Sequence, residues 1–535
     1  MPTLNWIGKQ AVVNHHRQVP YRLLTCDPEL SAGDPDAGNL LVEGDNLEAL
    51  KALLPYYAGQ VKCIYIDPPY NTGNENWVYN DNVNSPEIRN WLHQTVGREA
   101  EDLTRHDKWL CMMYPRLALL REFLREDGAI FVSIDDNELH SLGFVMDEVF
   151  GPRNRLAILV WKARQYLDSR SLTGVSLDHE YILVYAKLGS AVRLKGKERD
   201  ESKYTNPDND PRGHWMSRSI LGLAKADARP NLHYDLVDPA TNVTYRCPAN
   251  TGWRYSRETM DAKIKDGRML FPKNRRGRPR EKVFLNELQT ATTGFPSIID
   301  GVFTADGSQA IRDIFQEQVF AFPKAPELIR ALVDQAADRD SLILDSFAGS
   351  ATTAQAVLEL NKADGGHRRF ILVEMESEVA RNVAAQRLAR VINGYKATRG
   401  EKTIDVEGLG GGFRYCRLGT PLFDEGGNIA ALVSFADLAA HVFFTETGVP
   451  IPKRPTGKSP LLGVHEGKAV YLLYNGVMGD KRLKGGNVLT AAVLAKLPPH
   501  DGPKIVYGEA CRLSPERLGR EGIVFRQIPY EIKVT

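Results

Sequence analysis

The chain has 535 residues, enough for two or three domains rather than one. Hydrophobic residues make up 43% and charged residues 25%, the composition of an ordinary globular protein, and the net charge is only +1, so any nucleic-acid surface must come from local clustering. No run of about 18 apolar residues and no N-terminal signal sequence is visible, so we expect no membrane association. The six cysteines form no Cys-x-x-Cys pair, so we expect a reducing, cytoplasmic location and no metal site.

Residues 61–66 form a short apolar run that predicts a buried strand, and the sequence Asp67-Pro68-Pro69-Tyr70 follows it directly. Two prolines stop any continuation of a strand or a helix. We therefore expect a carboxylate, a proline carbonyl and an aromatic ring at the carboxyl edge of a sheet, which is where open α/β sheets place their chemistry.

This set of groups suits the activation of an exocyclic amine on a nucleobase. Such an amine is a poor nucleophile because its lone pair is delocalised into the ring. A carboxylate and a backbone carbonyl that accept its two hydrogens would localise the lone pair, while Tyr70 stacks on the base. The alternative interpretation is a strand that ends in a Pro-Pro turn with an incidental Asp67.

A second motif lies far downstream. Residues 341–345 predict another buried strand, residues 346–353 a turn of mostly small residues, and residues 354–360 a helix. A tight turn between a strand and a helix lets a ligand approach the backbone closely. About twenty residues beyond this turn the predicted strand 370–373 ends in Glu374, and an acid at that place in a βαβ unit commonly binds the two hydroxyls of a ribose.

Together these motifs resemble those of the S-adenosylmethionine-dependent DNA amino-methyltransferases of the β group, in which the catalytic motif precedes the cofactor motif. More narrowly, the chain is similar to the modification (Mod) subunits of type III restriction-modification systems. The match covers roughly residues 39–395, in the family's order. The stretches that carry it are residues 40–50, 65–73, 130–138, 179–185, 322–329 and 345–353.

The resemblance implies an α/β fold: a Rossmann-like class I methyltransferase sheet in permuted order, with an inserted target-recognition domain. Beyond the matched region, alternating strand and helix patterns predict a small C-terminal α/β domain. The resemblance also implies S-adenosylmethionine as cofactor. Two positions depart from the family's pattern, since Ala351 replaces a usual second glycine and Ala325 a frequent proline; alanine is small, so the turn is less permissive without being blocked. The expected cofactor-binding residues are Asp45, Asn46, Lys324, Asp345, Phe347, Ala348, Gly349, Ser350, Thr352, Thr353 and Glu374.

The implied activity is site-specific methylation of the N6 amino group of adenine in DNA, with the target base flipped out of the duplex. An acid at the first of the four catalytic positions is typical of adenine enzymes in this family, whereas cytosine N4 enzymes usually carry serine there. Three alternatives stay open: N4-cytosine methylation, methylation of RNA or a small molecule, and a DNA-binding regulator without catalysis. The expected catalytic residues are Asp67, Pro68, Pro69 and Tyr70.

Residues 254–282 form a basic segment, with eleven lysines and arginines against four acids. Trp253, Tyr255 and Phe271 are interleaved with it, and basic charge mixed with aromatic rings suits a DNA backbone and splayed bases. Its core, residues 276–279, would lie flat along a minor groove. The alternative is a solvated basic loop. The residues expected to bind DNA are Arg254, Lys273, Arg275, Arg276, Arg278 and Arg280.

These motifs divide the chain into parts. Expected partners are double-stranded DNA, a second copy of the chain and a restriction (helicase-nuclease) subunit. The last part would serve the dimer or the restriction-subunit contact, and the alternative is that it only stabilises the protein. The parts are an N-terminal arm at 1–38, the catalytic half of the methyltransferase domain at 39–195, a target-recognition domain at 196–318, the cofactor half at 319–400, a linker at 398–412 and a C-terminal α/β docking domain at 413–535.

Coarse secondary structure can be read inside these parts. Residues 108–124 predict a helix that stops at Asp127-Gly128, and residues 71–107 form a long polar connection of the kind that serves as a functional lid. In the C-terminal part we expect strands at 469–474, 504–507 and 523–526 and helices at 489–495 and 515–520.

Overall fold

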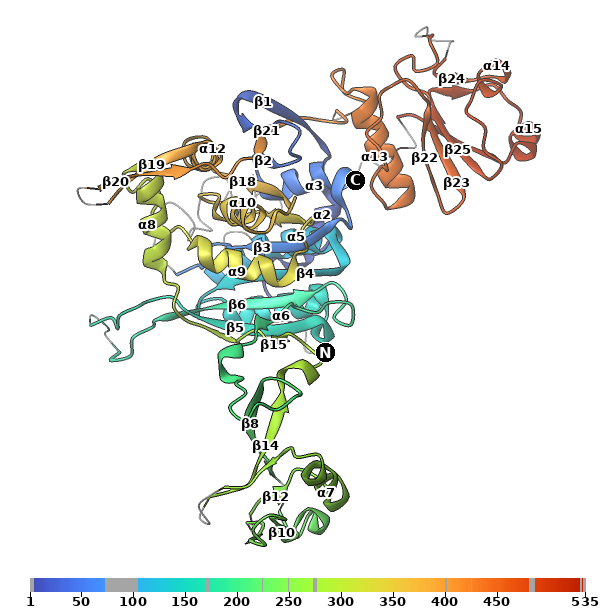
Figure 1. Cartoon of the computed structure of the whole chain (residues 1–535). Helices are drawn as coiled ribbons and strands as arrows, with labels where there is room; N and C mark the ends of the chain where they lie inside the picture. The colour runs from blue at the N-terminus through green and yellow to red at the C-terminus, as the bar shows by residue number, and fades with distance from the viewer. Residues whose placement is uncertain are drawn as a thin grey trace. The chain divides into compact units, whose positions relative to one another are not determined.

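The computed structural model describes residues 4–72, 104–169, 171, 173–223, 225–248, 250–272, 277–399, 402–424, 426–480, 486–529 and 532 (Figure 1). The chain divides into two compact units. One is Lys195–Phe295, and the other combines Met1–Leu194 with Pro296–Thr535. Most of the connection expected at 71–107 lies outside the described residues, as do the expected DNA-binding residues Lys273, Arg275 and Arg276.

The larger unit contains a ten-stranded sheet with the order β1-β21-β2-β18-β17-β3-β4-β6-β5-β16 (Figure 1). The run of strands from β21 to β4 is parallel, β6 is antiparallel to both of its neighbours, and β1 is antiparallel to β21. The bounds are β1 (Arg22–Gly33), β2 (Leu40–Glu43), β3 (Val61–Ile66), β4 (Leu124–Ile134), β5 (Arg155–Lys162), β6 (His179–Ala186), β16 (Ile298–Ile299), β17 (Leu342–Asp345), β18 (Arg369–Glu374) and β21 (Gly412–Pro421).

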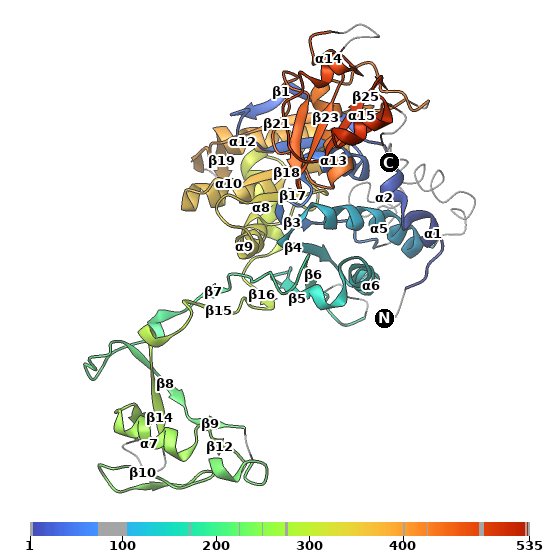
Figure 2. The same ribbon diagram turned by 90° about the vertical axis from the view of Figure 1, so that its right-hand side faces the viewer.

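The central strands are buried on both faces, which is why their sequences are continuous apolar runs rather than alternating ones. On one face, α3 (Asn46–Tyr57), α5 (Arg105–Phe123) and α6 (Leu139–Phe150) share a hydrophobic core with β3 and β4. Figure 2 shows α9 and α10 on the opposite side of the sheet from α5. The bounds of these helices and their neighbours are α1 (Lys9–Val12), α2 (His15–Gln18), α8 (Thr304–Phe315), α9 (Pro326–Ala336), α10 (Thr352–Asp364), α11 (Ser377–Val379) and α12 (Gln386–Asn393).

The elements predicted around the two motifs are confirmed. Strand 61–66 is β3, strand 341–345 is β17 and strand 370–373 lies within β18. The helix predicted at 108–124 is α5, which begins three residues earlier because Thr104 and Asp107 form a capping box at its start. The stop expected at Asp127-Gly128 is wrong, because α5 ends at Phe123 and these two residues lie within β4. The chain therefore has the mixed α/β sheet that was expected.

Four expected boundaries shift, because strands complete the sheets across them. The N-terminal arm contributes β1, and β21, from the start of the expected docking domain, lies between β1 and β2 in the main sheet. β16 pairs with β5, so the inserted unit ends at Phe295 instead of residue 318. The expected linker forms a hairpin of β19 (Gly394–Arg399) and β20 (Lys402–Glu407). An unpaired strand edge exposes backbone N–H and C=O groups. Each of these pairings supplies hydrogen-bond partners for the groups on one strand edge.

The same edge pairing brings two cysteines together. Cys26 of β1 and Cys416 of β21 form a disulfide with an S–S distance of 2.06 Å, a pairing that the dispersed cysteine pattern did not predict. Across the described ranges no group of three or more His, Cys, Asp or Glu could hold a metal ion. None of the helices described is long and apolar enough to cross a membrane.

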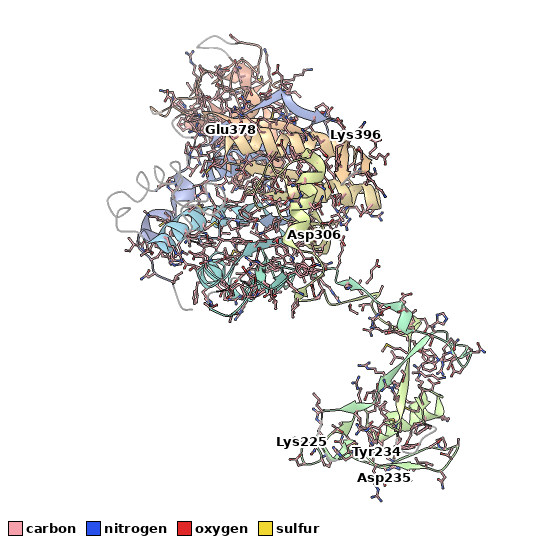
Figure 3. The ribbon with its side chains drawn as sticks, turned by 90° about the vertical axis from the view of Figure 1, so that its left-hand side faces the viewer. Lys225, Tyr234, Asp235, Asp306, Glu378 and Lys396 are labelled. Atoms are coloured by element: carbon pink, nitrogen blue, oxygen red, sulfur yellow. A yellow bond between two sulfur atoms is a disulfide. The ribbon has the colours of Figure 1, made fainter. Side chains whose placement is uncertain are left out.

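The smaller unit consists of short strands and one helix around a core of its own, which includes Trp253, Met260 and Tyr245. The Trp253 indole donates a 2.7 Å hydrogen bond to the Tyr234 carbonyl. Lys225, nine residues before Tyr234 in the sequence, is exposed (Figure 3). The bounds are β7 (Lys197–Glu198), β8 (Trp215–Ser219), β9 (Leu221–Gly222), β10 (Leu236–Val237), β11 (Thr244–Tyr245), β12 (Gly252–Trp253), α7 (Arg257–Lys265), β13 (Met269–Leu270), β14 (Arg280–Phe284) and β15 (Thr292–Thr293).

The C-terminal part contains a four-stranded sheet with the order β22-β23-β25-β27 (Figure 1). Alternate residues of β23 face α13 on one side and α14 and α15 on the other, so the sheet has helices on both faces. The predicted strands and helices are confirmed, except that Leu489 belongs to β24 and not to a helix. The bounds are α13 (Phe435–Thr447), β22 (Leu461–His465), β23 (Lys468–Leu472), β24 (Val488–Leu489), α14 (Ala491–Leu494), β25 (Lys504–Gly508), β26 (Ala510–Cys511), α15 (Pro515–Arg520) and β27 (Ile523–Gln527).

Candidate active site

The Asp67-Pro68-Pro69-Tyr70 turn follows β3 at the carboxyl edge of the sheet. The Trp109 indole on α5 donates a 2.6 Å hydrogen bond to the Pro69 carbonyl, which fixes the turn. The next residue, Asn71, is buried with left-handed backbone (φ 59°), and its amide donates a 2.5 Å hydrogen bond to Glu138. Because the Pro69 carbonyl is already engaged, the Pro68 carbonyl is the acceptor that the turn can offer to a ligand.

A lysine from the cofactor half of the chain reaches this turn. Lys324 Nζ lies 3.2 Å from Asp67 Oδ1 and 3.0 Å from Glu180 Oε2. It also donates a 2.7 Å hydrogen bond to the Tyr70 hydroxyl, which in turn donates to Glu180 at 2.8 Å. The ammonium lies 4.7 Å from the ring centroid of Tyr70 and 5.6 Å from that of Trp161. These five side chains, called here the lysine cluster, combine two carboxylates, one cation and two aromatic rings.

Burial governs the protonation of the lysine cluster. It raises the pKa of Asp67, while the attraction of Lys324 opposes this shift and the repulsion of Glu180 adds to it. Burial works to lower the pKa of Lys324, but the attraction of the two carboxylates outweighs it and the pKa is raised. The pKa of Tyr70 is raised far, first by burial and then by the same carboxylates. Lys324 is therefore a cation and Tyr70 a neutral donor at physiological pH.

The second motif forms the turn after β17, and hydrogen bonds to the Asp345 carboxylate stabilise this turn. Asp345 accepts a 3.0 Å hydrogen bond from the Phe347 N–H and a 2.5 Å hydrogen bond from the Thr353 hydroxyl. Burial raises the pKa of Asp345 to about 7 against these two bonds. Gly349 and Ala351 both have left-handed backbone, with φ of 50° and 64°. Glycine adopts that conformation freely, whereas alanine adopts it at some cost, so the departure at Ala351 falls on a position that favours glycine.

Glu374 ends β18 and lies against this turn, where its spacing predicted it. Its Oε2 accepts a 2.7 Å hydrogen bond from the Gly349 N–H, and its Oε1 accepts a 2.9 Å bond from the Glu376 N–H. Because β18 and β17 are parallel neighbours, this carboxylate stands beside the turn at the same edge of the sheet.

Asp45 and Asn46 support this edge from the start of α3. Asp45 caps α3 by accepting hydrogen bonds of 2.9 and 3.0 Å from two N–H groups of its first turn, and it pairs with the buried Arg116 at 2.8 Å. Asn46 donates a 3.2 Å hydrogen bond to the Ser346 carbonyl, which ties α3 to the turn. Their side chains thus hold the turn in place.

A buried arginine that sequence reasoning missed holds the turn from the other side. Arg387 is fully buried and donates to the Ser350 carbonyl at 3.0 Å, to the Ser350 hydroxyl at 2.8 Å and to the Thr352 hydroxyl at 2.8 Å. Burial lowers its pKa to about 10, so it stays charged at neutral pH. No local pattern marks it, because an arginine in a helix is ordinarily a surface residue.

A narrow cavity of about 20 Å³ joins the two motifs. Asp67 and Lys324 line it on one side and the turn after β17 lines it on the other. Of the predicted cofactor residues, Asp45, Asn46 and Glu374 do not line it but brace or flank the turn. The predicted residues that line it are Asp67, Lys324, Asp345, Phe347, Ala348, Gly349, Ser350, Thr352 and Thr353, together with Tyr65, Phe320, Phe322 and Pro323, which were not predicted.

Glu180 and Trp161 are further members of the lysine cluster that were not predicted as site residues. Glu180 did carry a signal, since it is an acid in the mostly apolar strand that the matching stretch 179–185 covers. Trp161 on β5 carried none, because a tryptophan in a strand is ordinarily a core residue.

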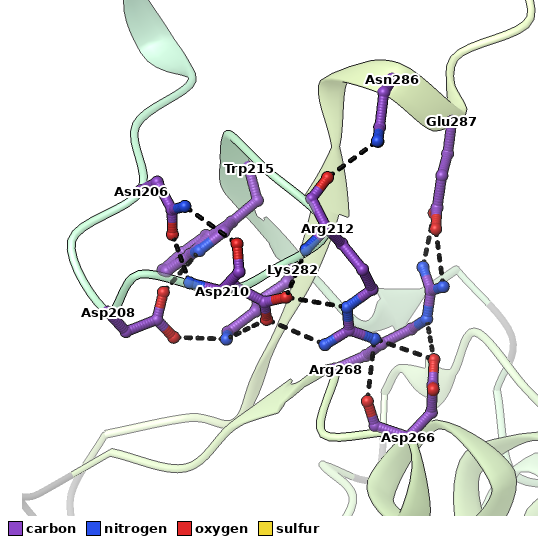
Figure 4. Close-up of polar contacts among 10 residues, drawn as sticks. All are labelled: Asn206, Asp208, Asp210, Arg212, Trp215, Asp266, Arg268, Lys282, Asn286 and Glu287. Atoms are coloured by element: carbon purple, nitrogen blue, oxygen red, sulfur yellow. Dashed lines mark hydrogen bonds and ion pairs between the residues drawn. The ribbon is translucent and has the colours of Figure 1, made fainter.

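Part of the basic segment is engaged in ion pairs inside the smaller unit (Figure 4). Lys282 bridges Asp208 and Asp210, the latter at 2.9 Å. Arg268 pairs with Glu287 at 2.5 Å and with Asp266. These charges hold the unit together, so the segment offers a ligand less positive charge than its sequence suggests.

The candidates for DNA contact that the structure describes are distinct from these paired residues. Arg254 and Arg278 are exposed. Arg280 is also exposed, but its guanidinium donates to the hydroxyl and the carbonyl of Ser217 at 2.6 and 2.9 Å, which joins β14 to β8. Arg254 and Arg278 are therefore the clearer candidates.

A family model described as DNA methylase, of the N6/N4 methyltransferase type, matches residues 61–386, which include both motifs and more than half of the chain. The chain belongs to this DNA methylase family. The Mod subunit of the type III restriction-modification enzyme StyLTI from Salmonella typhimurium is 30% identical over 508 residues, which are 86% of this chain and 75% of that protein. The resemblance to type III Mod subunits is thereby confirmed.

Two further relatives carry the same description. The EcoP15I Mod subunit from Escherichia coli is 31% identical over 428 residues, 70% of this chain and 64% of that protein. The EcoPI Mod subunit from Escherichia phage P1 is 33% identical over 423 residues, again 70% of this chain and 64% of that protein. The chain thus spans just under two thirds of these two relatives.

Solved structures of DNA methylases align more loosely. A putative DNA modification methylase from Thermus thermophilus aligns with a TM-score of 0.32 and 16% identity over 69% of this chain and 99% of that one. The cytosine-N4-specific PvuII DNA methyltransferase aligns with a TM-score of 0.33 and 12% identity over 65% of this chain and 86% of that one. These alignments are too distant to add to the sequence comparison.

Proposed function

We propose that the chain transfers a methyl group from S-adenosylmethionine to the N6 amino group of adenine at specific sites in DNA, as the modification subunit of a restriction-modification system. The observation that carries this proposal is the cavity that Asp67 shares with the turn after β17. Because β3 and β17 are parallel neighbours, an acid suited to an amine and a turn suited to a nucleoside meet at one sheet edge. Membership of the DNA methylase family supports the reaction class.

The residues around the turn fit S-adenosylmethionine. The Glu374 carboxylate suits the two hydroxyls of a ribose, and the partly buried Phe347 ring offers an apolar face to an adenine. When bound, the cofactor supplies a cationic sulfonium with a transferable methyl group. A cavity of about 20 Å³ has room for about one water, so we infer that Phe347 or residues 320–324 shift when the cofactor binds.

Asp67 and Pro68 activate the amine of the flipped adenine. The Asp67 carboxylate accepts one hydrogen of N6 and the Pro68 carbonyl accepts the other, while the Tyr70 ring stacks on the base. The two hydrogen bonds localise the nitrogen lone pair toward the methyl group. Asp67 does not need to be a strong base, because the nitrogen becomes acidic only after it has gained the methyl group, so alignment and electrostatics supply most of the rate.

Lys324 prepares Asp67 for this role. A buried carboxylate without a cation beside it would take up a proton and lose its ability to accept from the amine. The ammonium at 3.2 Å favours the ionised form of Asp67 in the absence of DNA. When the amine arrives, the ammonium withdraws toward Glu180, which already lies 3.0 Å from it. Glu180 therefore positions both Lys324 and the Tyr70 hydroxyl.

The acid at the first catalytic position supports adenine as the target. The resemblance associates Asp67 with N6 chemistry and a serine at that position with N4 chemistry. A carboxylate also accepts a hydrogen bond from an amine more strongly than a neutral hydroxyl does, because the acceptor is charged.

We extend the proposal to the rest of the chain. The sheet is a class I methyltransferase sheet in permuted order, because the cofactor strands β17 and β18 follow the catalytic strand β3 in sequence. The unit Lys195–Phe295 recognises the DNA target. The C-terminal sheet serves contact with a restriction subunit, the chain works as a dimer on double-stranded DNA, and its location is cytoplasmic. Relatives named as subunits of restriction-modification enzymes support contact with a restriction subunit.

Nucleoside analysis tests the proposed reaction. The purified chain is incubated with S-adenosylmethionine and unmethylated DNA, and the digested DNA is analysed by mass spectrometry. N6-methyladenine is the expected product. N4-methylcytosine would assign the enzyme to the cytosine branch, and the absence of any methylated nucleoside with folded protein would contradict the proposal.

A further inference from the structure

A second and larger cavity lies at the opposite edge of the main sheet from the active site. Its volume is about 450 Å³, and its walls come from β1, β2, β18, β21, α3 and residues 422–454. Leu40 and Arg369, which line it, are the first residues of β2 and β18, whereas the active site occupies the other ends of the strands. We call it the arginine cavity.

Three arginines line this cavity without an ion-pair partner. Throughout the described part of the chain, the guanidinium groups of Arg369, Arg414 and Arg454 make no hydrogen bond or ion pair, and Arg414 Nε is buried with no partner. A fourth, Arg22, is engaged by Glu48 at 3.0 Å. A buried guanidinium N–H without an acceptor is costly, so this arrangement is poised to receive one.

The three arginines come from separate segments of the chain, β18, β21 and the segment after α13, and all of them line the cavity. Burial raises the pKa of Tyr57, and each of the three arginines works to lower it. Each of the three charges therefore acts on the Tyr57 phenol, which also lines the cavity. Asp437 also lines the cavity and carries one negative charge, and its carboxylate accepts hydrogen bonds from the Tyr56 hydroxyl at 3.3 Å and the Ser434 hydroxyl at 2.5 Å, so three unpaired arginines stand against one acid. The cavity therefore has an excess of positive charge.

The rest of the wall is aromatic and apolar. Three tyrosines, at positions 21, 56 and 57, line it together with Leu23, Leu24, Pro55 and Ile451. A volume of about 450 Å³ falls within the usual range for a small-molecule site and is too small to enclose a DNA duplex.

We propose that the arginine cavity binds a nucleoside diphosphate or triphosphate. Guanidinium groups pair with phosphate oxygens through two parallel hydrogen bonds, and three of them from different segments match a chain of phosphates. The rings of Tyr56 and Tyr57, which are only partly buried, offer a face on which a base can stack. The phosphates of this ligand would pair with the arginines, and its base would pack against the aromatic and apolar wall. The site is separate from the methyl-transfer site.

Calorimetric titration with GDP and GTP tests this site, with the methyl-transfer pocket saturated by S-adenosylhomocysteine so that a nucleoside cannot bind there. Both nucleotides are expected to bind, with pyrophosphate weaker and guanosine weakest. Affinity is expected to fall with added salt, because partly exposed charges are screened.

Variants of the cavity arginines, compared with a matched control, test whether the nucleotide binds at this site. Replacing Arg369, Arg414 and Arg454 together with glutamine is expected to weaken GTP binding by about a hundredfold or more, since each charged hydrogen bond contributes substantially. Should that triple variant fail to fold, the exposed position allows Arg454→Glu as a single test, with at least a roughly tenfold loss expected. The control replaces an equal number of exposed arginines elsewhere with glutamine, namely Arg193, Arg512 and Arg520.

Three outcomes would overturn the proposal. One is that GTP and GDP do not bind the folded chain, and another is that they bind equally to the triple variant and its control. The third is that the triple variant loses affinity for duplex DNA while no mononucleotide binds, which would make the arginines a contact for the DNA backbone.

Discussion

Lys324 and Asp67 come from the two halves of the methyltransferase sheet, and their Nζ and Oδ1 atoms lie 3.2 Å apart. Glu180 lies on the other side of the same ammonium at 3.0 Å, and the Tyr70 hydroxyl bonds to both. The lysine thus joins the catalytic turn to the segment in front of α9, and the charge state of the acceptor carboxylate depends on it.

The neighbours of Asp67 are expected to move the acid limb of the pH–rate profile in opposite directions. Lys324 lowers the pKa of Asp67 and Glu180 raises it. Lys324→Met should therefore shift the loss of activity to higher pH, and Glu180→Gln should shift it to lower pH. The measurement is the single-turnover rate of methyl transfer across the acid range. Lys362→Met, which removes an ion pair with Glu407, is the control.

A purely structural role for these two residues predicts something different. In that case both variants would lose the same fraction of the rate at every pH, and their acid limbs would coincide with that of the unaltered chain. Such a result would contradict the assignment of Lys324 as the partner that favours the ionised form of Asp67.

The cofactor site is tested by Glu374→Ala and Phe347→Ala. The first removes the carboxylate proposed to bind the ribose, and a charged hydrogen bond of that kind contributes ~1.5–3 kcal/mol. The second removes an apolar face. Both should weaken S-adenosylmethionine binding measured by calorimetry, whereas Glu378→Ala, at an exposed position on α11, should not (Figure 3). Unchanged affinity in both variants would rule out this placement of the cofactor.

We expect the basic segment to contain residues that bind DNA and residues that stabilise the fold. Arg254→Glu with Arg278→Glu should weaken DNA binding and flatten its salt dependence, because each lost phosphate contact removes ~0.9 from the slope. The same is expected of Arg275 and Arg276. Affinity for S-adenosylmethionine should stay unchanged. An unaltered salt slope would mean that these arginines are only solvated.

Lys282→Met should act differently, through stability. It removes the lysine that Asp208 and Asp210 share, while buried Asp210 keeps its ion pair with Arg212 at 2.8 Å, so the smaller unit should lose part of its stability. A lower midpoint of thermal unfolding is the expected result, and a midpoint equal to that of the unaltered chain would show that the pair does not support the smaller unit.

Local sequence predicted the elements that carry the two motifs. The apolar runs before Asp67 and Asp345 are strands because both faces of the sheet are covered, and the spacing from the turn to Glu374 follows from one helix and one return strand. These are short-range properties, which a pattern along the chain can express.

Long-range pairing was not predictable in the same way. Nothing in residues 22–33 indicates that they pair with residues 412–421, since an edge strand has no distinctive composition. The ion pair between Lys324 and Asp67 likewise depends on two loops that meet only after the sheet has formed. The charge of Lys282 and Arg268 was overestimated because their acidic partners Asp208 and Glu287 lie outside the basic segment.

The central claim is that the Asp67 carboxylate receives the target amine, and Asp67→Ala tests it most directly. Single-turnover methyl transfer to DNA is measured together with calorimetric binding of S-adenosylmethionine to the same variant. The expected result is a rate reduced by about a hundredfold to a thousandfold or more, as when a fixed electrostatic group is removed from an active site, with cofactor affinity within a few-fold of the unaltered chain. A near-normal rate of N6-methyladenine formation by the folded variant would contradict the claim.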